Sequence, residues 1–428
     1  MKILLINPPI RMNKEPYFQP IGLSIIASVL RDDHEVDILD INVQRDGFAF
    51  PIVNYDLIGI SGLITTYKYV YDLMPLLRER YICPIVIGGG GITSAPDEYM
   101  KNLKPDYGVL GEGERTIVEL IEYIEGSREN PPNGTISKYF VTPARELADL
   151  DDLPSQAFDM FDMEAYISAD RHLKRDAAIV ATRGCPHNCA FCYHIFGRSF
   201  RYRNPVKVVD EMELLMNEYK AESFLFGDEC ITANKKNLLA LCKEIVDRGL
   251  KAPWICYSRV DTIDEEMAIA MKAAGCVKIG FGLESGSQRI LDTMNKGVTI
   301  EKMIDTWNIV QKHIPVSGTF IFGTPGEDIR SLYENMYFQE ITGQSRKFFH
   351  LSPYPGTKFY EENIDKILAK FGNLHNFFIA LGDAGDFVIN LTDWSDEEYH
   401  ARYRMLYLNL SMAQAIRKGN YDIFHRTK

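Results

Sequence analysis

The sequence has few cysteines for its length and no long apolar run. Its eight cysteines are spread over 428 residues, which is too sparse for a disulfide scaffold and is typical of a reducing compartment. No stretch reaches the roughly 18 uninterrupted apolar residues that a membrane-spanning helix needs. Residues 1–9 hold only a short apolar run before two prolines, so we expect no secretory signal and a cytoplasmic protein with no membrane partner.

Basic residues are in deficit as well. Lys and Arg total 47 and Asp and Glu total 59, which gives a formal net charge of −12. This balance argues against a broad basic surface, and we therefore expect no nucleic-acid partner. With 46% hydrophobic and 25% charged residues the composition is that of an ordinary globular protein. The length suggests about three folding units.

Residues 1–126 alternate short apolar runs with amphipathic stretches. This rhythm predicts a Rossmann-like parallel sheet with helices on both faces, whose ligands bind at the carboxyl ends of the strands. Small residues at those ends would let a flat ligand approach the backbone. The sequence lacks a GxGxxG motif after its first strand, which argues against a dinucleotide. The predicted strand ends carry Asn7, Pro8, Ser61, Gly88, Gly89, Gly90, Gly111, Glu112, Gly113 and Glu114.

The rest of the chain predicts a second α/β domain. Residues 127–157 are polar and Pro-rich, as in a linker. Residues 158–360 hold six predicted strands with helices between them, which fits a partial (β/α)6 barrel better than an eight-stranded one. Residues 361–428 are predicted to form a short, mainly helical region, which ends in an amphipathic helix over 397–417.

Three cysteines follow the first strand of the second series. Cys185, Cys189 and Cys192 have the spacing CxxxCxxC, which can wrap a loop around a cubane cluster, with three irons held and one left open. A zinc site is the alternative, with His187 or His194 as fourth ligand, but structural zinc sites are usually built on small modules. We interpret the remaining cysteines as small core residues; they are Cys83, Cys230, Cys242, Cys256 and Cys276.

The cysteine segment, with Phe191 before its last cysteine, resembles the defining CxxxCxΦC motif of the radical S-adenosylmethionine superfamily. The resemblance covers roughly residues 155–360 and implies a [4Fe–4S] cluster on the three cysteines, with S-adenosylmethionine on the open iron. Taken singly, the matching strand ends could also be solvated ends, helix caps or turns. The residues that match the family's S-adenosylmethionine contacts are Phe191, Tyr193, Gly227, Asp228, Glu229, Ser258, Arg259, Glu284 and Gly323.

A parallel α/β domain ahead of such a barrel resembles the cobalamin-dependent, methyltransferase-type subclass of the superfamily. The resemblance implies that the strand ends of residues 1–126 hold cobalamin, with Thr65, Thr66 and Tyr67 under the corrin. The sequence lacks the DxHxxG motif that supplies an axial histidine in another group of cobalamin proteins. The one histidine before residue 127, His34, is predicted to lie in a surface turn, so we expect cobalt without a histidine ligand from the protein.

The resemblance implies methylation of an unactivated carbon by a 5′-deoxyadenosyl radical and methylcobalamin, with two S-adenosylmethionines consumed per product. Alternatives are a ring-forming or ring-contracting enzyme with the same cofactors, and a sensor that binds cobalamin or a cluster without turnover. A transfer-RNA methylthiolase is disfavoured by the acidic chain. The expected partners are a peptide, protein or small-molecule substrate and an electron donor such as ferredoxin or flavodoxin. A run after the cysteines could meet an acidic substrate or form a solvated loop; it contains Arg198, Arg201, Tyr202 and Arg203.

Overall fold

The computed structural model describes residues 1–9, 18–44, 48–343 and 348–407. It divides into two compact units. The first comprises Met1–Gly184, Tyr193–Leu225 and Ile367–Leu381; the second comprises Cys185–Cys192, Phe226–Lys366 and the chain from Gly382 onward. Each unit is therefore assembled from separate stretches of sequence.

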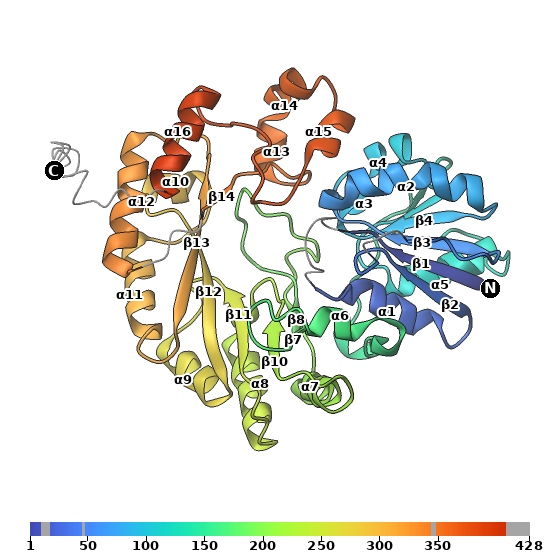
Figure 1. Ribbon diagram of the computed structural model, residues 1–428, viewed down its shortest axis with the longest axis horizontal. Coiled ribbons are helices and arrows are strands. Elements are labelled where there is room, and N and C mark those ends of the chain that lie inside the picture. The colour runs from blue at the N-terminus through green and yellow to red at the C-terminus, as the bar shows by residue number, and fades with distance from the viewer. Residues whose placement is uncertain (10–17, 45–47, 344–347, 408–428) are drawn as a thin grey trace. The chain divides into compact units, whose positions relative to one another are not determined.

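A six-stranded sheet forms the centre of the first unit (Figure 1). Its order is β2-β1-β3-β4-β5-β6, and all pairs are parallel except the last. The central strand β1 is apolar and fully buried from Ile3 to Ile6, as expected for a strand covered on both faces. The strands are β1 (Lys2–Asn7), β2 (Glu35–Asp40), β3 (Leu57–Ser61), β4 (Ile85–Gly88), β5 (Tyr107–Val109) and β6 (Thr135–Ser137).

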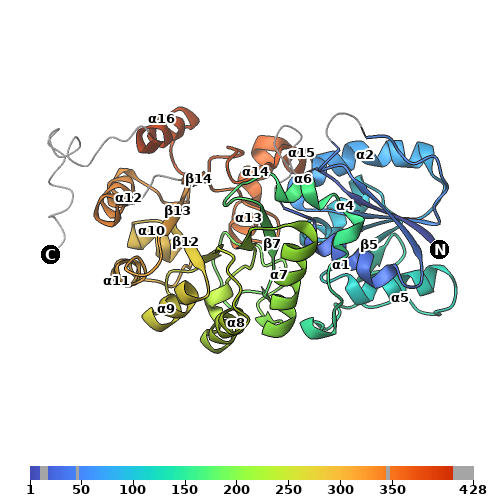
Figure 2. The same cartoon turned by 60° about the horizontal axis from the view of Figure 1, so that its bottom comes forward.

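Helices cover both faces of this sheet. Helices α1 (Ile21–Leu30) and α5 (Glu114–Ile124) pack together on one face, and α2 (Tyr67–Arg80) lies on the other (Figures 1 and 2). The short helices α3 (Gly90–Ser94) and α4 (Pro96–Asn102) follow β4. A late segment of the chain, α15 (Leu374–Ala380), packs against α2 and α4.

The range 127–157, predicted to be a linker, contributes a strand. β6 pairs antiparallel with β5, and Ile136 at its centre lies opposite Gly108 and is buried. This strand could not be recognised in the sequence for two reasons. Turn-forming residues surround it, and three residues are too few to show an alternating pattern. The range therefore extends the sheet of the first domain.

The predicted six-stranded partial barrel is confirmed. A second sheet has the order β14-β13-β12-β11-β10-β7, and its described pairs from β11 to β14 are parallel. Helices α8, α9, α11 and α12 run along one side of its strands (Figures 1 and 2). The strands are β7 (Asp176–Ile179), β10 (Ser223–Phe226), β11 (Trp254–Ser258), β12 (Cys276–Glu284), β13 (Val316–Phe322) and β14 (Phe348–His350). The helices are α8 (Lys235–Asp247), α9 (Glu265–Ala273), α11 (Ile300–Val310) and α12 (Ile329–Thr342).

The remaining elements are short. A small antiparallel ribbon joins β8 (Thr182–Arg183) to β9 (Arg201–Tyr202). The other helices are α6 (Met163–Ile167), α7 (Pro205–Tyr219), α10 (Gln288–Thr293), α13 (Lys358–Glu362), α14 (Ile364–Phe371) and α16 (Asp396–Tyr407). Of the helix predicted over 397–417, the part after residue 407 lies outside the described residues. Within the described chain, no helix has the length and apolarity needed to cross a membrane.

Candidate cofactor sites

A cavity of about 340 Å³ lies in the first unit, at the carboxyl ends of the strands of its sheet. Parallel strands bring their carboxyl ends to one edge, which is where the sequence places its small and polar residues. Most of the residues predicted to bind cobalamin line this cavity: Asn7, Pro8, Ser61, Thr66, Gly88, Gly89, Gly90, Gly111, Glu112, Gly113 and Glu114.

The glycines after β4 bring the backbone close to its neighbours. Gly89 has a φ of +96°, and a Cβ there would lie 2.8 Å from the carbonyl oxygen of Gly62. A Cβ on Gly90 would lie 2.8 Å from Cδ1 of Ile195, which also lines the cavity. Side chains at these positions would displace the cavity wall. The open glycine edge and the largely apolar walls fit a large, flat ring such as a corrin.

Thr65 and Tyr67 do not line this cavity. Tyr67 is fully buried in the first unit, its hydroxyl lies 2.9 Å from Nδ1 of His375, and its ring packs against Tyr99 and Phe378. Burial raises the pKa of this phenol well above its ordinary value. The structure thus places Tyr67 in the contact between α2 and α15.

Several cavity residues were not singled out by sequence analysis. Gln19 is 4% exposed, and its side-chain oxygen accepts a hydrogen bond of 3.3 Å from the amide of Ala178. Asn42, Arg183 and Phe196 also line the cavity. Since these residues lie far from the glycine turns in sequence, no local pattern marks them. No histidine is found among the described residues that line the cavity, and His34 directly precedes β2.

The cysteine loop in the second unit is held by backbone and side-chain hydrogen bonds. The amide of Ala190 donates to the carbonyl of Met294 across 2.8 Å, and the carbonyl of Ala190 accepts from the amide of Phe359 across 3.1 Å. The side-chain amide of Asn295 donates to the carbonyl of Asn188 across 2.6 Å. The loop therefore has a defined path, anchored on the residues that follow α10.

The three cysteines are largely enclosed. Cys185 and Cys189 are each 9% exposed, and burial together with the nearby Cys189 raises the pKa of the Cys192 thiol to about 12. Iron must therefore displace a proton from this thiol, as is usual when metals bind cysteine. Cys230, predicted to be a core residue, is buried, and its thiol interacts with that of Cys185. Among the described residues, no three His, Cys, Asp or Glu side chains are arranged to hold a single metal ion.

Arg259 links the cysteine loop to the predicted S-adenosylmethionine residues. Its Nη1 donates to the sulfur of Cys189 across 3.2 Å. Asp261 accepts from Nε and Nη2 across 2.9 and 2.8 Å, and the carbonyl of Lys296 accepts from Nη2 across 2.6 Å. A guanidinium held in this way can stabilise a thiolate, which fits a cluster ligand at Cys189.

Glu284 and Lys296 form a buried ion pair beside this arginine. Nζ of Lys296 lies 3.0 Å from Oε1 of Glu284, and the side chains are 4% and 10% exposed. Glu284 has a φ of +66°, and a Cβ on Gly282 would lie 2.4 Å from its Oε1. The same Nζ lies 5.8 Å from the ring centre of Phe191. Lys296 thus compensates the charge of a carboxylate that the sequence predicts to contact S-adenosylmethionine.

The other predicted S-adenosylmethionine residues are found at strand ends, with one exception. Gly227, Asp228 and Glu229 follow β10, and Ser258 ends β11 with its Oγ 3.8 Å from the sulfur of Cys230. Gly323 follows β13, and its amide donates to Oε2 of Glu327 across 3.0 Å. The exception is Tyr193, which belongs to the first unit, where its ring lies near Gly90.

The arginines after the cysteine loop have internal partners in the first unit. Arg201 makes two hydrogen bonds to Glu112, of 2.6 and 2.9 Å, and Arg203 pairs with Glu211 across 2.6 Å. These two side chains are therefore committed to the fold, whereas Tyr202 is half exposed.

Two family models match the chain. The B12 binding domain matches residues 10–121, and the Radical SAM superfamily matches residues 179–336. The two models thus match the chain in the order of domains that the sequence predicts. They cover the cysteine loop and the strand ends around the cavity other than the end of β1, where Asn7 and Pro8 lie before residue 10.

Curated relatives match most of the chain. An uncharacterised methyltransferase, PH0819, of Pyrococcus horikoshii is 29% identical, over 96% of this chain and 92% of its own. The anaerobic magnesium-protoporphyrin IX monomethyl ester cyclase of Rubrivivax gelatinosus is 30% identical, over 86% of this chain and 71% of its own.

A solved structure shares the fold. It is the radical S-adenosylmethionine methyltransferase TsrM from Kitasatospora setae, with cobalamin and a [4Fe–4S] cluster bound; the TM-score is 0.70 at 21% identity, over 86% of this chain and 76% of that one. The fold, the two matched domains and the relatives agree. The chain therefore belongs to the cobalamin-dependent radical S-adenosylmethionine enzymes, which use cobalamin, a [4Fe–4S] cluster and S-adenosylmethionine.

Proposed function

We propose that this enzyme methylates an unactivated carbon and consumes two S-adenosylmethionines per product. One observation carries the proposal: a glycine-edged cavity and an arginine-supported cysteine loop occur in one chain. When bound, cobalamin supplies the methyl group, and the cluster with S-adenosylmethionine supplies the radical that opens the C–H bond.

The residues of the second unit orient and shield this chemistry. Arg259 and Lys296 are at most 6% exposed, so they supply positive charge in surroundings from which water is largely excluded. Such enclosure protects reactive species from side reactions. We assign Arg259 to support of the cluster ligand Cys189. We assign Glu284, with its charge compensated by Lys296, to S-adenosylmethionine binding.

The proposal is tested by counting the fates of S-adenosylmethionine. The protein is reconstituted anaerobically with iron, sulfide and hydroxocobalamin, reduced, and incubated with substrate fractions. Each methyl transfer would yield one 5′-deoxyadenosine and one S-adenosylhomocysteine, because one S-adenosylmethionine gives the radical and the other restores the methyl group. Cys192→Ala should yield no 5′-deoxyadenosine. A product that carries no label from methyl-labelled S-adenosylmethionine would refute methyl transfer.

Ring formation is the second candidate, and the relationship to the Rubrivivax gelatinosus cyclase favours it. A cyclisation needs a radical but no methyl donor. It would therefore give 5′-deoxyadenosine without matching S-adenosylhomocysteine, and a product with the same number of carbons as the substrate. The ratio of the two nucleosides decides between the candidates.

We further propose a peptide, protein or small-molecule substrate and an electron donor such as ferredoxin or flavodoxin. Substrate size is tested by supplying extract fractions above and below about 1 kDa, a cut-off chosen because most peptides of ten residues exceed it. The donor is tested by comparing 5′-deoxyadenosine formation with each reduced protein against dithionite. If neither protein supports turnover while dithionite does, the donor proposal is wrong.

A further inference from the structure

The two ends of the cysteine loop form part of the cavity wall in the first unit. Arg183 precedes Cys185 by two residues, and Ile195 and Phe196 follow Cys192 by a few residues. All three line the cavity at the strand ends. The loop that carries the cluster ligands thus begins and ends at the predicted cobalamin site.

Arg183 binds the turn that follows β5. Its Nη1 donates to Oε1 of Glu112 across 3.1 Å, and its Nη2 donates to Oε1 of Glu114 across 2.7 Å. The three side chains are only 7 to 8% exposed. The guanidinium carbon also lies 4.9 Å from the ring centre of Phe196. One buried cation therefore joins the Gly111 to Glu114 turn to both ends of the loop.

Arg201 binds the same carboxylate from the opposite strand of the ribbon. It lies opposite Arg183 in the pairing of β8 with β9, makes two hydrogen bonds to Glu112, and donates to the carbonyl of Ala148 across 2.8 Å. A ribbon of two residues per strand is not stable alone. Its geometry therefore depends on Glu112, whose carboxylate both arginines share.

The charges of this group cancel. Two carboxylates face two guanidinium groups, and although burial opposes ionisation, hydrogen bonds from Arg201 and the charge of Arg183 hold the pKa of Glu112 below its ordinary value. The pKa of Arg183 is raised, because Glu114 and Glu112 outweigh the opposing effect of burial. Glu112 and Arg183 therefore remain charged in the neutral pH range, and loss of the Glu112 carboxylate removes the acidic partner to which Arg201 makes its two hydrogen bonds.

We propose that Glu112, with Arg183 and Arg201, is a positioning residue that couples occupancy of the cobalamin cavity to order in the loop of residues 184–200. A ligand that orders Arg183, Ile195 and Phe196 at the cavity lowers the cost of ordering the chain between them, which carries the three cysteines. Because such coupling is reciprocal, each cofactor must strengthen binding of the other by the same factor. The inference rests on the two cofactor assignments, but not on methyl transfer or on the substrate.

The test measures hydroxocobalamin binding by equilibrium dialysis, with and without the reconstituted cluster. We expect the cluster to tighten binding by about fivefold or more, the lower end of ordinary coupling. Bound hydroxocobalamin should correspondingly slow the loss of iron to a chelator. In Glu112→Gln the cluster should no longer change hydroxocobalamin affinity, and hydroxocobalamin should no longer slow iron loss, so that both factors are about onefold. Arg201→Lys keeps the charge but loses the two-pronged contact, and both factors should be intermediate.

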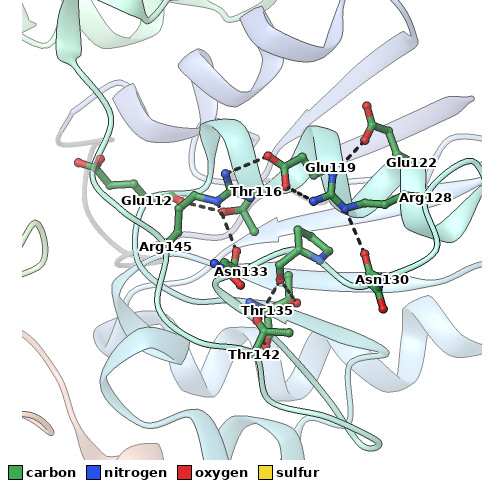
Figure 3. Close-up of polar contacts among 11 residues, drawn as sticks. Glu112, Thr116, Glu119, Glu122, Arg128, Asn130, Asn133, Thr135, Thr142 and Arg145 are labelled. Carbon is green, nitrogen blue, oxygen red and sulfur yellow. Dashed lines mark hydrogen bonds and ion pairs between the residues drawn. The ribbon is translucent and has the colours of Figure 1, made fainter.

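Glu119→Gln is the matched control. Glu119 lies on α5 and makes two hydrogen bonds to Arg145, of 2.9 and 2.6 Å, but does not line the cavity. Figure 3 shows the Glu112 side chain directed away from this pair. Glu119→Gln should keep the full coupling factor, which separates a local effect from general destabilisation.

Three outcomes would overturn the proposal. Equal hydroxocobalamin affinity with and without the cluster in the wild type would refute the coupling and leave the cofactor assignments intact. Equal loss of coupling in Glu119→Gln and Glu112→Gln would show that any damage to the domain suffices. Absence of hydroxocobalamin binding by the wild type would refute the cobalamin assignment itself, and with it the coupling.

Discussion

The guanidinium of Arg259 donates a hydrogen bond to the sulfur of Cys189 across 3.2 Å. The same side chain is fixed by Asp261 and by the carbonyl of Lys296. Its orientation is therefore set by groups other than the cysteine, and it should persist when the sulfur binds iron. Arg259 is therefore a partner of a predicted cluster ligand, and the CxxxCxxC motif itself does not reveal this partner.

Arg259→Gln should weaken the cluster without removing a ligand. Loss of a partner to a metal ligand typically costs 10- to 100-fold in metal affinity, and we expect about that increase in iron loss to a chelator. Iron loss from Arg259→Lys should be intermediate between wild type and Arg259→Gln, because lysine keeps the positive charge but lacks the planar guanidinium that donates several hydrogen bonds at once. Arg289→Gln, at a half-exposed pair with Asp328, is the control. Equal iron retention in Arg259→Gln and wild type would contradict this role.

Lys296→Met should destabilise the second unit by about 3–5 kcal/mol, because it leaves the Glu284 carboxylate buried and unpaired. Glu284→Gln combined with Lys296→Met should recover much of that stability but not S-adenosylmethionine binding. Thermal unfolding and equilibrium dialysis of the reconstituted protein measure the two effects.

Lys235→Met removes a partner of Asp264 at a more exposed position, where an ion pair contributes little to stability. It should change the midpoint of unfolding little. If Lys296→Met is as mild as Lys235→Met, the buried pair has no structural role and our account of Glu284 is wrong.

Gly89→Ala should damage the predicted cobalamin cavity. It places a Cβ 2.8 Å from the Gly62 carbonyl oxygen at a φ of +96°, and we expect a loss of about 2–4 kcal/mol with weaker hydroxocobalamin binding. Gly126→Ala has a φ of +80° but no atom within 4 Å of the added carbon, so it should cost about 1–2 kcal/mol. Affinity should be unchanged in that control. Similar hydroxocobalamin affinities for the two variants would show that the added carbon at Gly89 does not affect hydroxocobalamin binding in the cavity, which contradicts the prediction.

Glu327 should make the second unit less stable as pH rises. Burial raises the pKa of this carboxyl to about 8, against hydrogen bonds from Gly323 and Thr324 that lower it, whereas its ordinary value is 4.5. Between these two values the unfolded chain has lost the proton that the folded chain keeps. Stability is therefore fully present below pH 4.5, and falls by about 4 kcal/mol at most by pH 8.

Glu327→Gln is neutral at every pH and should flatten this dependence. The midpoint of thermal unfolding at pH 5 and at pH 8.5, in wild type and variant, gives the comparison. If the wild type and Glu327→Gln lose stability in parallel over this range, the carboxyl is already ionised in the folded protein.

Local patterns predicted which residues lie at the strand ends that border the cavity. Asn7, Ser61 and Gly88 could be assigned to one edge because parallel strands present their carboxyl ends together. The direction of a side chain in the helix that follows a strand could not be assigned in this way. Tyr67 begins α2, and its partner His375 follows it by 308 residues, a pairing that no periodicity encodes.

Residues that complete a site from a distance were also missed. Lys296 lies twelve residues after Glu284, beyond α10, and in the sequence it resembles an ordinary solvated lysine. Cys230 is buried, as its apolar neighbours predicted, but its interaction with Cys185 could not be predicted from them. In both cases the tertiary fold, and not the local composition, determines the partner.

The discontinuity of the first unit has a consequence for synthesis of the chain. Its last piece, Ile367–Leu381, includes α15, which packs against α2. Ribosomes add about 5–20 residues per second, so α2 emerges roughly tens of seconds before the helix that covers Tyr67. During that interval the apolar surface of the first unit that α15 covers is exposed to solvent. We therefore expect a nascent chain stopped before residue 367 to need a chaperone, and the complete chain not to need one.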